Sequence, residues 1–196
     1  MKVGISKGRI EEIFYKRLID KKIIDSYDKN SRKYETDIDD YEMYLLKSCD
    51  IIPLLNEKCI DIGILGSDII EEYNSDLIEE LCDFDTGKCS FMIAALPNME
   101  LSSIKRVATK YPSIAKYLLE SISLNCEIKK MNGSIEIAPK LNYADAIIDL
   151  IETGSTLEAN GLIELGRFNT ISTKIISRKE DKNKQKIKRF LNRIGE

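Results

Sequence analysis

The chain has 196 residues, of which 43% are hydrophobic and 32% charged, and its net charge is −3. These proportions are typical of a folded globular protein, and the balance of charge excludes the large positive excess of a general nucleic-acid binder. The sequence contains no histidine, which excludes Ser-His and Cys-His nucleophiles, HExxH zinc sites and every imidazole base. Catalysis would therefore depend on carboxylates, cations, backbone amides or a hard metal ion.

The sequence also predicts where the protein is found. Its first ten residues, MKVGISKGRI, lack the apolar stretch of a signal peptide, and no segment approaches the ~20 apolar residues that span a bilayer. The five cysteines are odd in number, scattered and never spaced as CxxC, which favours reduced thiols over disulfides or a zinc site. We expect a cytoplasmic protein that binds neither membranes nor nucleic acid.

Apolar runs of strand length alternate along the chain with stretches of helical period, which predicts an α/β fold. In the first half we expect strands at 2–6, 44–46 and 60–65, with helices at 9–22, from 50 and from 68. In the second half we expect strands at 90–96, 105–109, 126–130 and 146–151. Helices are expected at 112–120, 134–141 and 180–194, with a short one from the turn at 153–156 to 160. Two such series without a flexible linker predict two lobes, residues 1–88 with 170–196 and residues 89–169.

The turn that follows the strand at 146–151 has the strongest chemical signal. Thr153-Gly-Ser-Thr156 opens a helix, and the first amides of a helix have no internal partner and bind phosphate well. Gly154 allows close approach of an anion, while Asp149 and Glu152 lie where carboxylates reach ribose hydroxyls or a magnesium ion. The alternative is a plain Ser/Thr N-cap, and the segment matches neither a P-loop nor a dinucleotide fingerprint.

Together with other segments, this turn resembles the ATP phosphoribosyltransferase family, in the short form that lacks a C-terminal regulatory domain. Each match alone is weak, but the matches keep their order along the whole chain. They are Ser6–Arg9, Ser31–Lys33, Asp50–Pro53, Asp61–Asp68, Gly87–Cys89, Arg106–Pro112, Asn132–Pro139, Ala144–Asp149, Glu152–Leu157 and Ala159–Leu162.

The resemblance implies a two-lobed α/β fold like that of the type II periplasmic binding proteins, with the ligand in a cleft. It implies transfer of the phosphoribosyl group of phosphoribosyl pyrophosphate to N1 of ATP, with release of pyrophosphate, in the first step of histidine biosynthesis. Mg²⁺ is expected to arrive with the substrate. The implied assembly is a hetero-oligomer of a homodimeric core and a regulatory subunit resembling histidyl-tRNA synthetase.

The turn and the resemblance together give candidate residues in the second lobe. We expect the 5′-phosphate to be bound by Thr153, Gly154, Ser155, Thr156 and Leu157. Asp149 is the candidate for the ribose hydroxyls, and Glu136, Asp145 and Glu152 are further carboxylates that contact substrate. Asp145 fits a role in bracing its strand equally well.

Cations are the candidates in the first lobe. The resemblance implies that Arg32 and Lys47 face pyrophosphate during catalysis. Lys7, Gly8 and Arg9 follow the first strand, where an open α/β sheet binds ligands, and are expected to bind nucleotide or diphosphate. The alternative for each cation is an ordinary surface side chain.

Two residues depart from the family pattern, because Lys58 and Asn142 stand where a glycine is usual. Asparagine tolerates left-handed backbone, whereas a lysine in that conformation is strained. Three other functions remain open: a binding module of the same fold, a subunit of weak activity, and a phosphoribosyltransferase for another base. The last of these commonly has two adjacent acidic residues before its phosphate turn, and Asp149-Leu150 lacks that pair.

Overall fold

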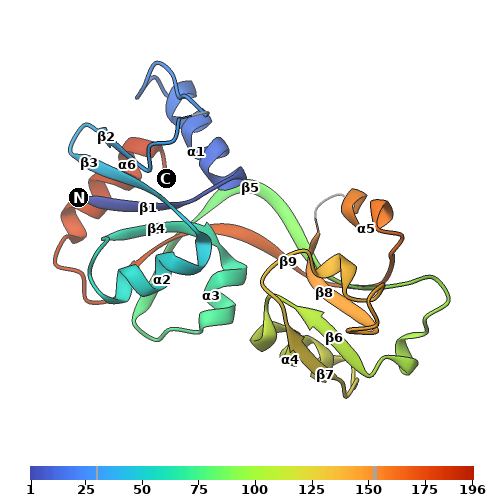
Figure 1. The fold of residues 1–196 in the computed structure, drawn as a ribbon. Coiled ribbons are helices and arrows are strands. Elements are labelled where there is room, and N and C mark those ends of the chain that lie inside the picture. Colours follow the sequence, from blue (N-terminus) through green and yellow to red (C-terminus); the bar gives the residue numbers. More distant parts are fainter. Residues whose placement is uncertain (30, 152–153) are drawn as a thin grey trace. The chain divides into compact units, whose positions relative to one another are not determined.

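The computed structural model of the chain describes residues 1–29, 31–151 and 154–196, and describes 85–88 by their backbone alone. It has the predicted α/β class, and the chain divides into two compact units, residues 1–87 with 172–196 and residues 88–171 (Figure 1). Two long strands, β5 (Ile78–Ala95) and β9 (Ile163–Arg178), contribute residues to both units. No helix in the described ranges is both long and apolar enough to cross a membrane.

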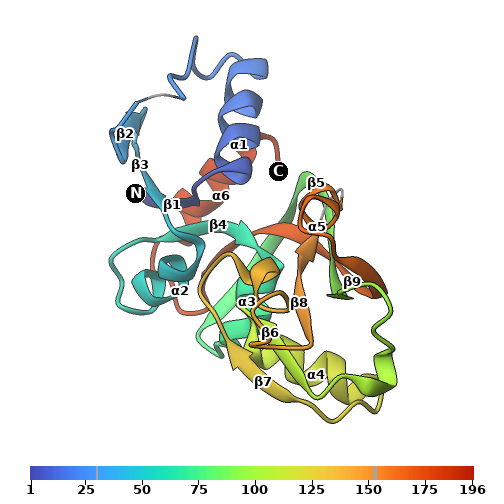
Figure 2. The ribbon, with the colours of Figure 1, turned by 45° about the vertical axis from the view of Figure 1, so that its right-hand side comes forward.

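The first unit is built on a mixed sheet with the strand order β2-β3-β1-β4-β9. Strand β1 runs parallel to β3 and β4, while β2 and β9 are antiparallel to their neighbours. Helices α1 and α6 cover one face, and α2 and α3 cover the other (Figures 1 and 2). The bounds are β1 Lys2–Ser6, α1 Arg9–Asp20, β2 Glu35–Ile38, β3 Tyr41–Leu46, α2 Ser48–Asn56, β4 Ile62–Gly66, α3 Ser67–Tyr73 and α6 Lys184–Ile194.

Each face of this sheet has its own apolar layer, because alternate residues of a strand point to opposite faces. Val3 and Ile5 of β1 lie in the same buried cluster as Phe14 of α1 and Phe190 of α6. On the other face α2 packs directly on strand backbone, since a Cβ at Gly63 would lie 2.5 Å from Ile51. A side chain at residue 63 would therefore push α2 away from the sheet.

The second unit has a sheet with the order β5-β8-β6-β7, in which β6 is parallel to both neighbours and β5 is antiparallel to β8. Helix α4 covers one face, and a 3-10 turn, η2, and the short helix α5 lie on the other. The bounds are η1 Leu101–Ser103, β6 Arg106–Thr109, α4 Pro112–Ser121, β7 Glu127–Lys130, η2 Ile135–Ile137, β8 Ala146–Ile151 and α5 Ser155–Ala159.

The structure differs from the sequence expectation in several elements. Strands β2 and β9 were not predicted, and β5 begins at residue 78 rather than 90. These stretches are rich in charged and polar residues, so they contain no long apolar run to mark them as strands. The helix expected through residue 141 is a single 3-10 turn followed by further turns, and α2 begins at Ser48 rather than at Asp50.

Both departures from the usual glycines have left-handed backbone, with φ 62° at Lys58 and 53° at Asn142. Lys58 ends α2 in a Schellman motif: its amide donates to the Leu55 carbonyl (3.0 Å), and the Cys59 amide donates to the Leu54 carbonyl (2.9 Å). The hydrogen bonds at the helix end thus hold the backbone of Lys58 in a conformation that suits glycine better.

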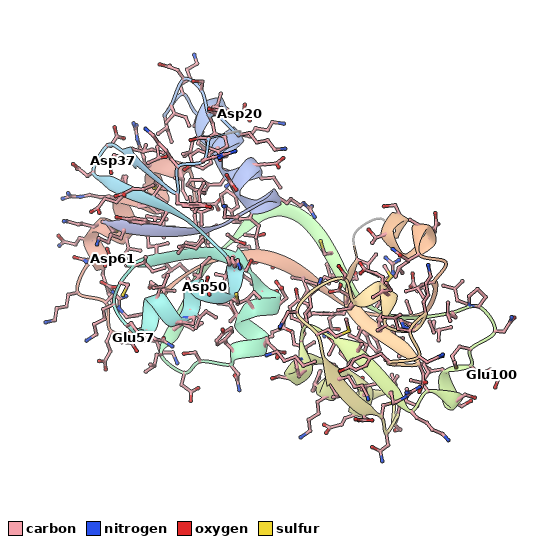
Figure 3. The ribbon with its side chains drawn as sticks, viewed as in Figure 1. Asp20, Asp37, Asp50, Glu57, Asp61 and Glu100 are labelled. Atoms are coloured by element: carbon pink, nitrogen blue, oxygen red, sulfur yellow. The ribbon has the colours of Figure 1, made fainter. Side chains whose placement is uncertain are left out.

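Replacing this lysine by glycine is expected to stabilise the protein. A left-handed lysine costs ~1–2 kcal/mol, part of which the extra entropy of unfolded glycine offsets, so Lys58→Gly should raise the free energy of unfolding by about 0.5–1 kcal/mol. Urea unfolding followed by circular dichroism measures this change. The matched control is Glu57→Gly at the end of α2 (Figure 3), where φ is −76° and glycine should destabilise by about 0.5–1 kcal/mol. Equal effects of the two changes would contradict the strain at Lys58.

Candidate functional site

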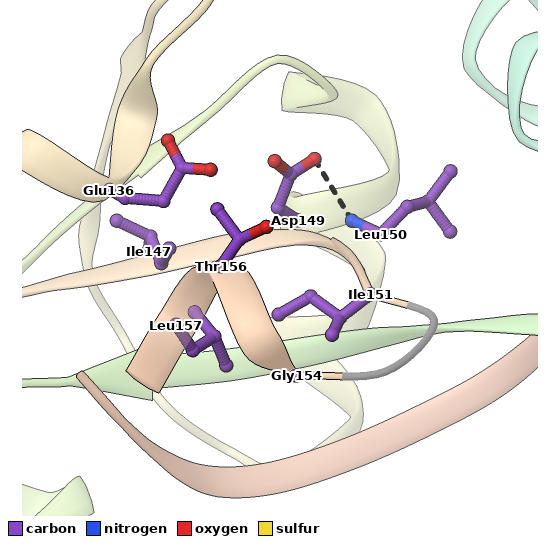
Figure 4. Close-up of a pocket in the computed structure, with 8 residues that line it drawn as sticks. All are labelled: Glu136, Ile147, Asp149, Leu150, Ile151, Gly154, Thr156 and Leu157. Carbon is purple, nitrogen blue, oxygen red and sulfur yellow. Dashed lines mark hydrogen bonds between the residues drawn. The ribbon is translucent and has the colours of Figure 1, made fainter. Parts of the chain in front are cut away.

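A cavity of about 280 Å³ lies in the second unit, where β8 ends and α5 begins. Two carboxylates, Glu136 and Asp149, and the hydroxyl of Thr156 gather around the same space (Figure 4). The lining residues are Glu136, Ile147, Asp149, Leu150, Ile151, Gly154, Thr156 and Leu157. The cavity therefore combines acidic groups with the first turn of a helix.

Local backbone geometry forms the helix side of this cavity. Gly154 has φ 78° and caps α5, whose internal hydrogen bonds begin with the Glu158 amide donating to the Gly154 carbonyl (3.1 Å). Leu157 is buried in the apolar layer beneath and anchors the helix. A Cβ built on Gly154 would meet nothing within 4 Å, so open space adjoins the backbone where the helix starts. This combination suits an anion, because the first amides of a helix lack partners within it.

Asp149 is the buried charge of the cavity, with 7% of its surface exposed. Its Oδ2 accepts a hydrogen bond from Lys110 Nζ (3.1 Å), and its Oδ1 accepts one from the Leu150 amide (2.9 Å). Burial raises the pKa of Asp149 above its ordinary 3.8, with Glu136 acting in the same direction, while Lys110 and the Leu150 amide oppose the rise. The lysine thus favours the ionised form of a carboxyl group that burial disfavours.

Strand register brings Lys110 to Asp149. In the parallel pair β6 and β8, Thr109 lies beside Ile148, so the next residues of each strand are neighbours at the same edge. The sequence analysis did not choose Lys110 as a site residue. The sequence does show that Lys110 is a basic residue directly after a strand. Recognising it as a partner of Asp149 would have required the order of the strands in the sheet.

Asp145 is not brought to this cavity. It lies just before β8, at the other end of the strand, where it accepts hydrogen bonds from Arg106 Nη2 (2.6 Å) and from the amides of Lys105 and Arg106. The Arg106 hydrogen bond, followed by those amides, holds the pKa of Asp145 below its ordinary value. This geometry favours the bracing role. Two other predicted residues, Glu152 and Thr153, lie outside the described part of the chain, and Ser155 is exposed at the start of α5.

In the first unit, parallel strands also bring predicted residues to one edge. Ser6 of β1 lies beside Leu46 of β3, so Lys7 and Lys47 leave neighbouring strands together. The hydroxyl oxygens of Ser6 and Ser48 are 2.5 Å apart and join the two strand ends. Both lysines are exposed, which leaves their ammonium groups open to a ligand.

The Lys7–Arg9 turn has a conformation that needs glycine. Gly8 has φ 93° and ψ −131°, a region that L-residues avoid, and it caps α1. Lys7 Nζ lies 4.1 Å from the ring centroid of Tyr34, an exposed aromatic residue near Arg32 in sequence. Arg32 is exposed in the chain before β2, and Arg9 is partly exposed as the first residue of α1.

Comparison with known proteins decides the family. The family model described as ATP phosphoribosyltransferase matches residues 47–196. The ATP phosphoribosyltransferase of Listeria monocytogenes serovar 1/2a is 36% identical over 196 residues, which cover 97% of this chain and 91% of that protein. The chain belongs to the ATP phosphoribosyltransferase family. The predicted enzyme class, a pentosyl transferase of histidine biosynthesis, is thereby confirmed.

Solved structures agree with the family and confirm the predicted fold. A chain of the ATP phosphoribosyl transferase (HisG:HisZ) complex from Thermotoga maritima aligns with a TM-score of 0.82 at 27% identity, covering 99% of this chain and 96% of that chain. The periplasmic aliphatic sulphonate binding protein SsuA from Escherichia coli aligns with a TM-score of 0.63 at 17% identity. The alignment covers 99% of this chain and 70% of that chain. The second likeness shows the fold alone.

Phosphoribosyltransferases typically require a metal ion, and the cavity can be tested for one. Within the described residues, no group of three Asp, Glu or Cys side chains is placed to hold a metal. Glu136 and Asp149 supply two carboxylates around open space. This set suits a hard cation whose other ligands are substrate oxygens and water.

Asp149 lies in β8 and Asp145 directly before it. Replacing each by asparagine should change the pH dependence of stability in opposite directions. The pKa of Asp149 is raised on folding, so wild-type stability falls as pH rises from 3.8 through the folded pKa. Asp149→Asn removes that loss, so its stability relative to wild type should increase over the same rise in pH. Asp145→Asn should instead cost about 1–3 kcal/mol near pH 7, because a charged hydrogen-bond network is broken. That cost should shrink as pH falls below 3.8, since the pKa of Asp145 is lowered on folding.

Urea unfolding of wild type and both variants between about pH 2.5 and pH 8 measures these differences, since the Asp145 effect lies below 3.8 and the Asp149 effect above it. A parallel pH dependence for the two variants would contradict the assigned environments.

Proposed function

We propose that this ATP phosphoribosyltransferase binds the phosphoribosyl group of phosphoribosyl pyrophosphate in the cavity at the end of β8. The observation that supports this best is the meeting of Asp149, Glu136 and the first turn of α5 around one space. We take the two compact units to be the predicted lobes, 1–88 with 170–196 and 89–169.

The reaction suits a chain without histidine. Adenine N1 of ATP uses its lone pair to form a bond to the anomeric carbon of ribose. The bond from that carbon to the pyrophosphate oxygen breaks, and its electron pair leaves with pyrophosphate. N1 carries no proton, so no strong base is needed. Catalysis then depends on alignment, worth up to ~7–11 kcal/mol, and on stabilisation of charge in the transition state.

In the second unit we assign the 5′-phosphate to the turn at 153–156 and to the amides that follow. The Thr156 hydroxyl adds a donor, and Gly154 leaves the approach open. Asp149 accepts hydrogen bonds from the ribose hydroxyls, and Lys110 keeps it ionised for that purpose. Glu136 faces the same space and is the second carboxylate of the site. We no longer assign Asp145 to substrate.

In the first unit we assign the anionic groups of the substrates to the cations at the ends of β1 and β3. Lys47 and Arg32 stabilise the departing pyrophosphate, and the Lys7–Arg9 turn binds nucleotide or diphosphate. We propose Mg²⁺ as the metal, arriving on the diphosphate; when bound, it would neutralise charge on the leaving group. Glu136 and Asp149 are the residues that could contact it.

We propose that the chain is a short-form catalytic subunit that works in the cytoplasm. The solved relative from Thermotoga maritima is a HisG:HisZ complex. By analogy, a homodimeric core of this chain would assemble with a regulatory subunit resembling histidyl-tRNA synthetase.

The first test is release of pyrophosphate by the purified protein supplied with ATP, Mg²⁺ and phosphoribosyl pyrophosphate, with mass detection of the N1-linked product. We expect release that requires both substrates, alone or after addition of the regulatory subunit. No product under either condition would overturn the proposed reaction for this chain.

Loss of the Thr156 hydroxyl should weaken binding of phosphoribosyl pyrophosphate. A hydrogen bond to a charged group is worth about 1.5–3 kcal/mol, so Thr156→Ala should raise the dissociation constant roughly 10- to 100-fold. Titration calorimetry measures it, and an unchanged circular dichroism spectrum shows that the fold persists. Glu158→Gln on the same helix is the matched control and should not weaken binding. Equal affinities of Thr156→Ala and wild type would move the phosphate site elsewhere.

A further inference from the structure

Glu11, in the first turn of α1, uses both of its carboxylate oxygens for contacts near the Lys7–Arg9 turn. Its Oε2 accepts a hydrogen bond from the Gly8 amide (2.9 Å). Its Oε1 accepts a hydrogen bond from the hydroxyl of Tyr27. One side chain therefore contacts the turn before the helix and the chain that follows it.

Tyr27 is itself held in place. Its ring stacks on that of Tyr15, with centroids 3.8 Å apart and an interplanar angle of 4°, and Tyr15 is 1% exposed in the core of the unit. Burial and the Glu11 acceptor raise the pKa of the Tyr27 hydroxyl. The Tyr27–Glu11 contact thus connects the apolar core to the Gly8 amide.

The chain between α1 and β2, which contains Tyr27, also carries Arg32 and Tyr34. Lys7 contacts the Tyr34 ring, and an exposed ion pair joins Glu12 to Lys29 (2.8 Å). Both of these contacts lie at the surface, where a single pair contributes little. The Glu11–Tyr27 hydrogen bond is the one anchored on a buried ring.

We propose that Glu11, through its hydrogen bond from Tyr27, is a positioning residue that holds the Lys7–Arg9 turn in its anion-binding conformation. The proposal rests on the assignment of that turn to substrate in the proposed function. Glu11 touches no reacting atom. It fixes the amide of Gly8, and thereby the directions in which Lys7 and Arg9 leave the turn.

A carboxylate suits this position better than an amide. Both of its oxygens accept, which matches two donors, an N–H and an O–H. A glutamine would offer one oxygen and one nitrogen, so it would keep one of the two contacts in its present form. The sequence analysis did not single out this residue, because a Glu three positions after a helix cap is a common capping arrangement.

The test is Tyr27→Phe, which removes the hydroxyl and keeps the stacked ring. Its matched control is Tyr44→Phe, since the Tyr44 hydroxyl also donates to carboxylates, those of Glu35 and Glu42. We expect Tyr27→Phe to raise the KM of one substrate about tenfold, as the loss of one such hydrogen bond implies, with kcat changed less than twofold. Tyr44→Phe should leave both constants unchanged. In a Glu11→Ala background, Tyr27→Phe should have no further effect on KM, because the acceptor is gone.

Lys7→Met separates failure of this inference from failure of the proposed function. If Lys7→Met raises the KM of a substrate, Tyr27→Phe should raise the KM of that same substrate. A raised KM for Lys7→Met with normal constants for Tyr27→Phe would overturn the positioning role alone. Unchanged constants for Lys7→Met would show that the turn does not bind substrate, and would overturn both assignments. An equal fall in melting temperature together with an equal rise in KM in Tyr27→Phe and Tyr44→Phe would overturn the positioning role, because it would show a merely structural effect.

Discussion

A buried carboxylate with a single counter-charge is the interaction on which the candidate site depends. Asp149 is nearly inaccessible, and a buried charge is tolerated when it is paired and hydrogen-bonded. Lys110 provides the pairing because β6 runs parallel beside β8 and ends at the same edge. If β6 were antiparallel to β8, the residue after β6 would lie at the far end of the strand. The sheet topology of the second unit therefore determines whether the cavity can hold an ionised acid.

The same topological rule operates in the first unit with opposite charge. There the parallel pair β1 and β3 ends in Lys7 and Lys47, both of which are exposed. Cations on an open edge suit groups that change charge during the reaction, such as a departing pyrophosphate. A buried, fixed carboxylate suits groups that must be oriented, such as ribose hydroxyls. Neither arrangement needs a base that titrates near neutral pH.

How much could be predicted depended on the range of the interactions. Strands β1, β4 and β8 were predicted because each is a contiguous apolar run, and the left-handed backbone at Asn142 and Lys58 is a local property. Strand β9 was not predicted, because its pattern is polar over half its length. The Lys110–Asp149 pair joins residues 39 positions apart. Strand order decides such a pair, and the sequence alone does not give that order.

Gly154 and Gly8, the glycines of the two candidate turns, are required for different physical reasons. The described chain accepts several residues other than glycine at positive φ, even a lysine. The αL conformation of Gly154 is therefore not sufficient to explain its identity, since an asparagine would adopt it at small cost. A Cβ there would project into space free of protein atoms, where the phosphate is proposed to lie. Gly8 has backbone angles that other residues avoid, so conformation alone accounts for it. A side chain at Gly154 would thus act mainly on ligand binding, whereas one at Gly8 would first distort the turn.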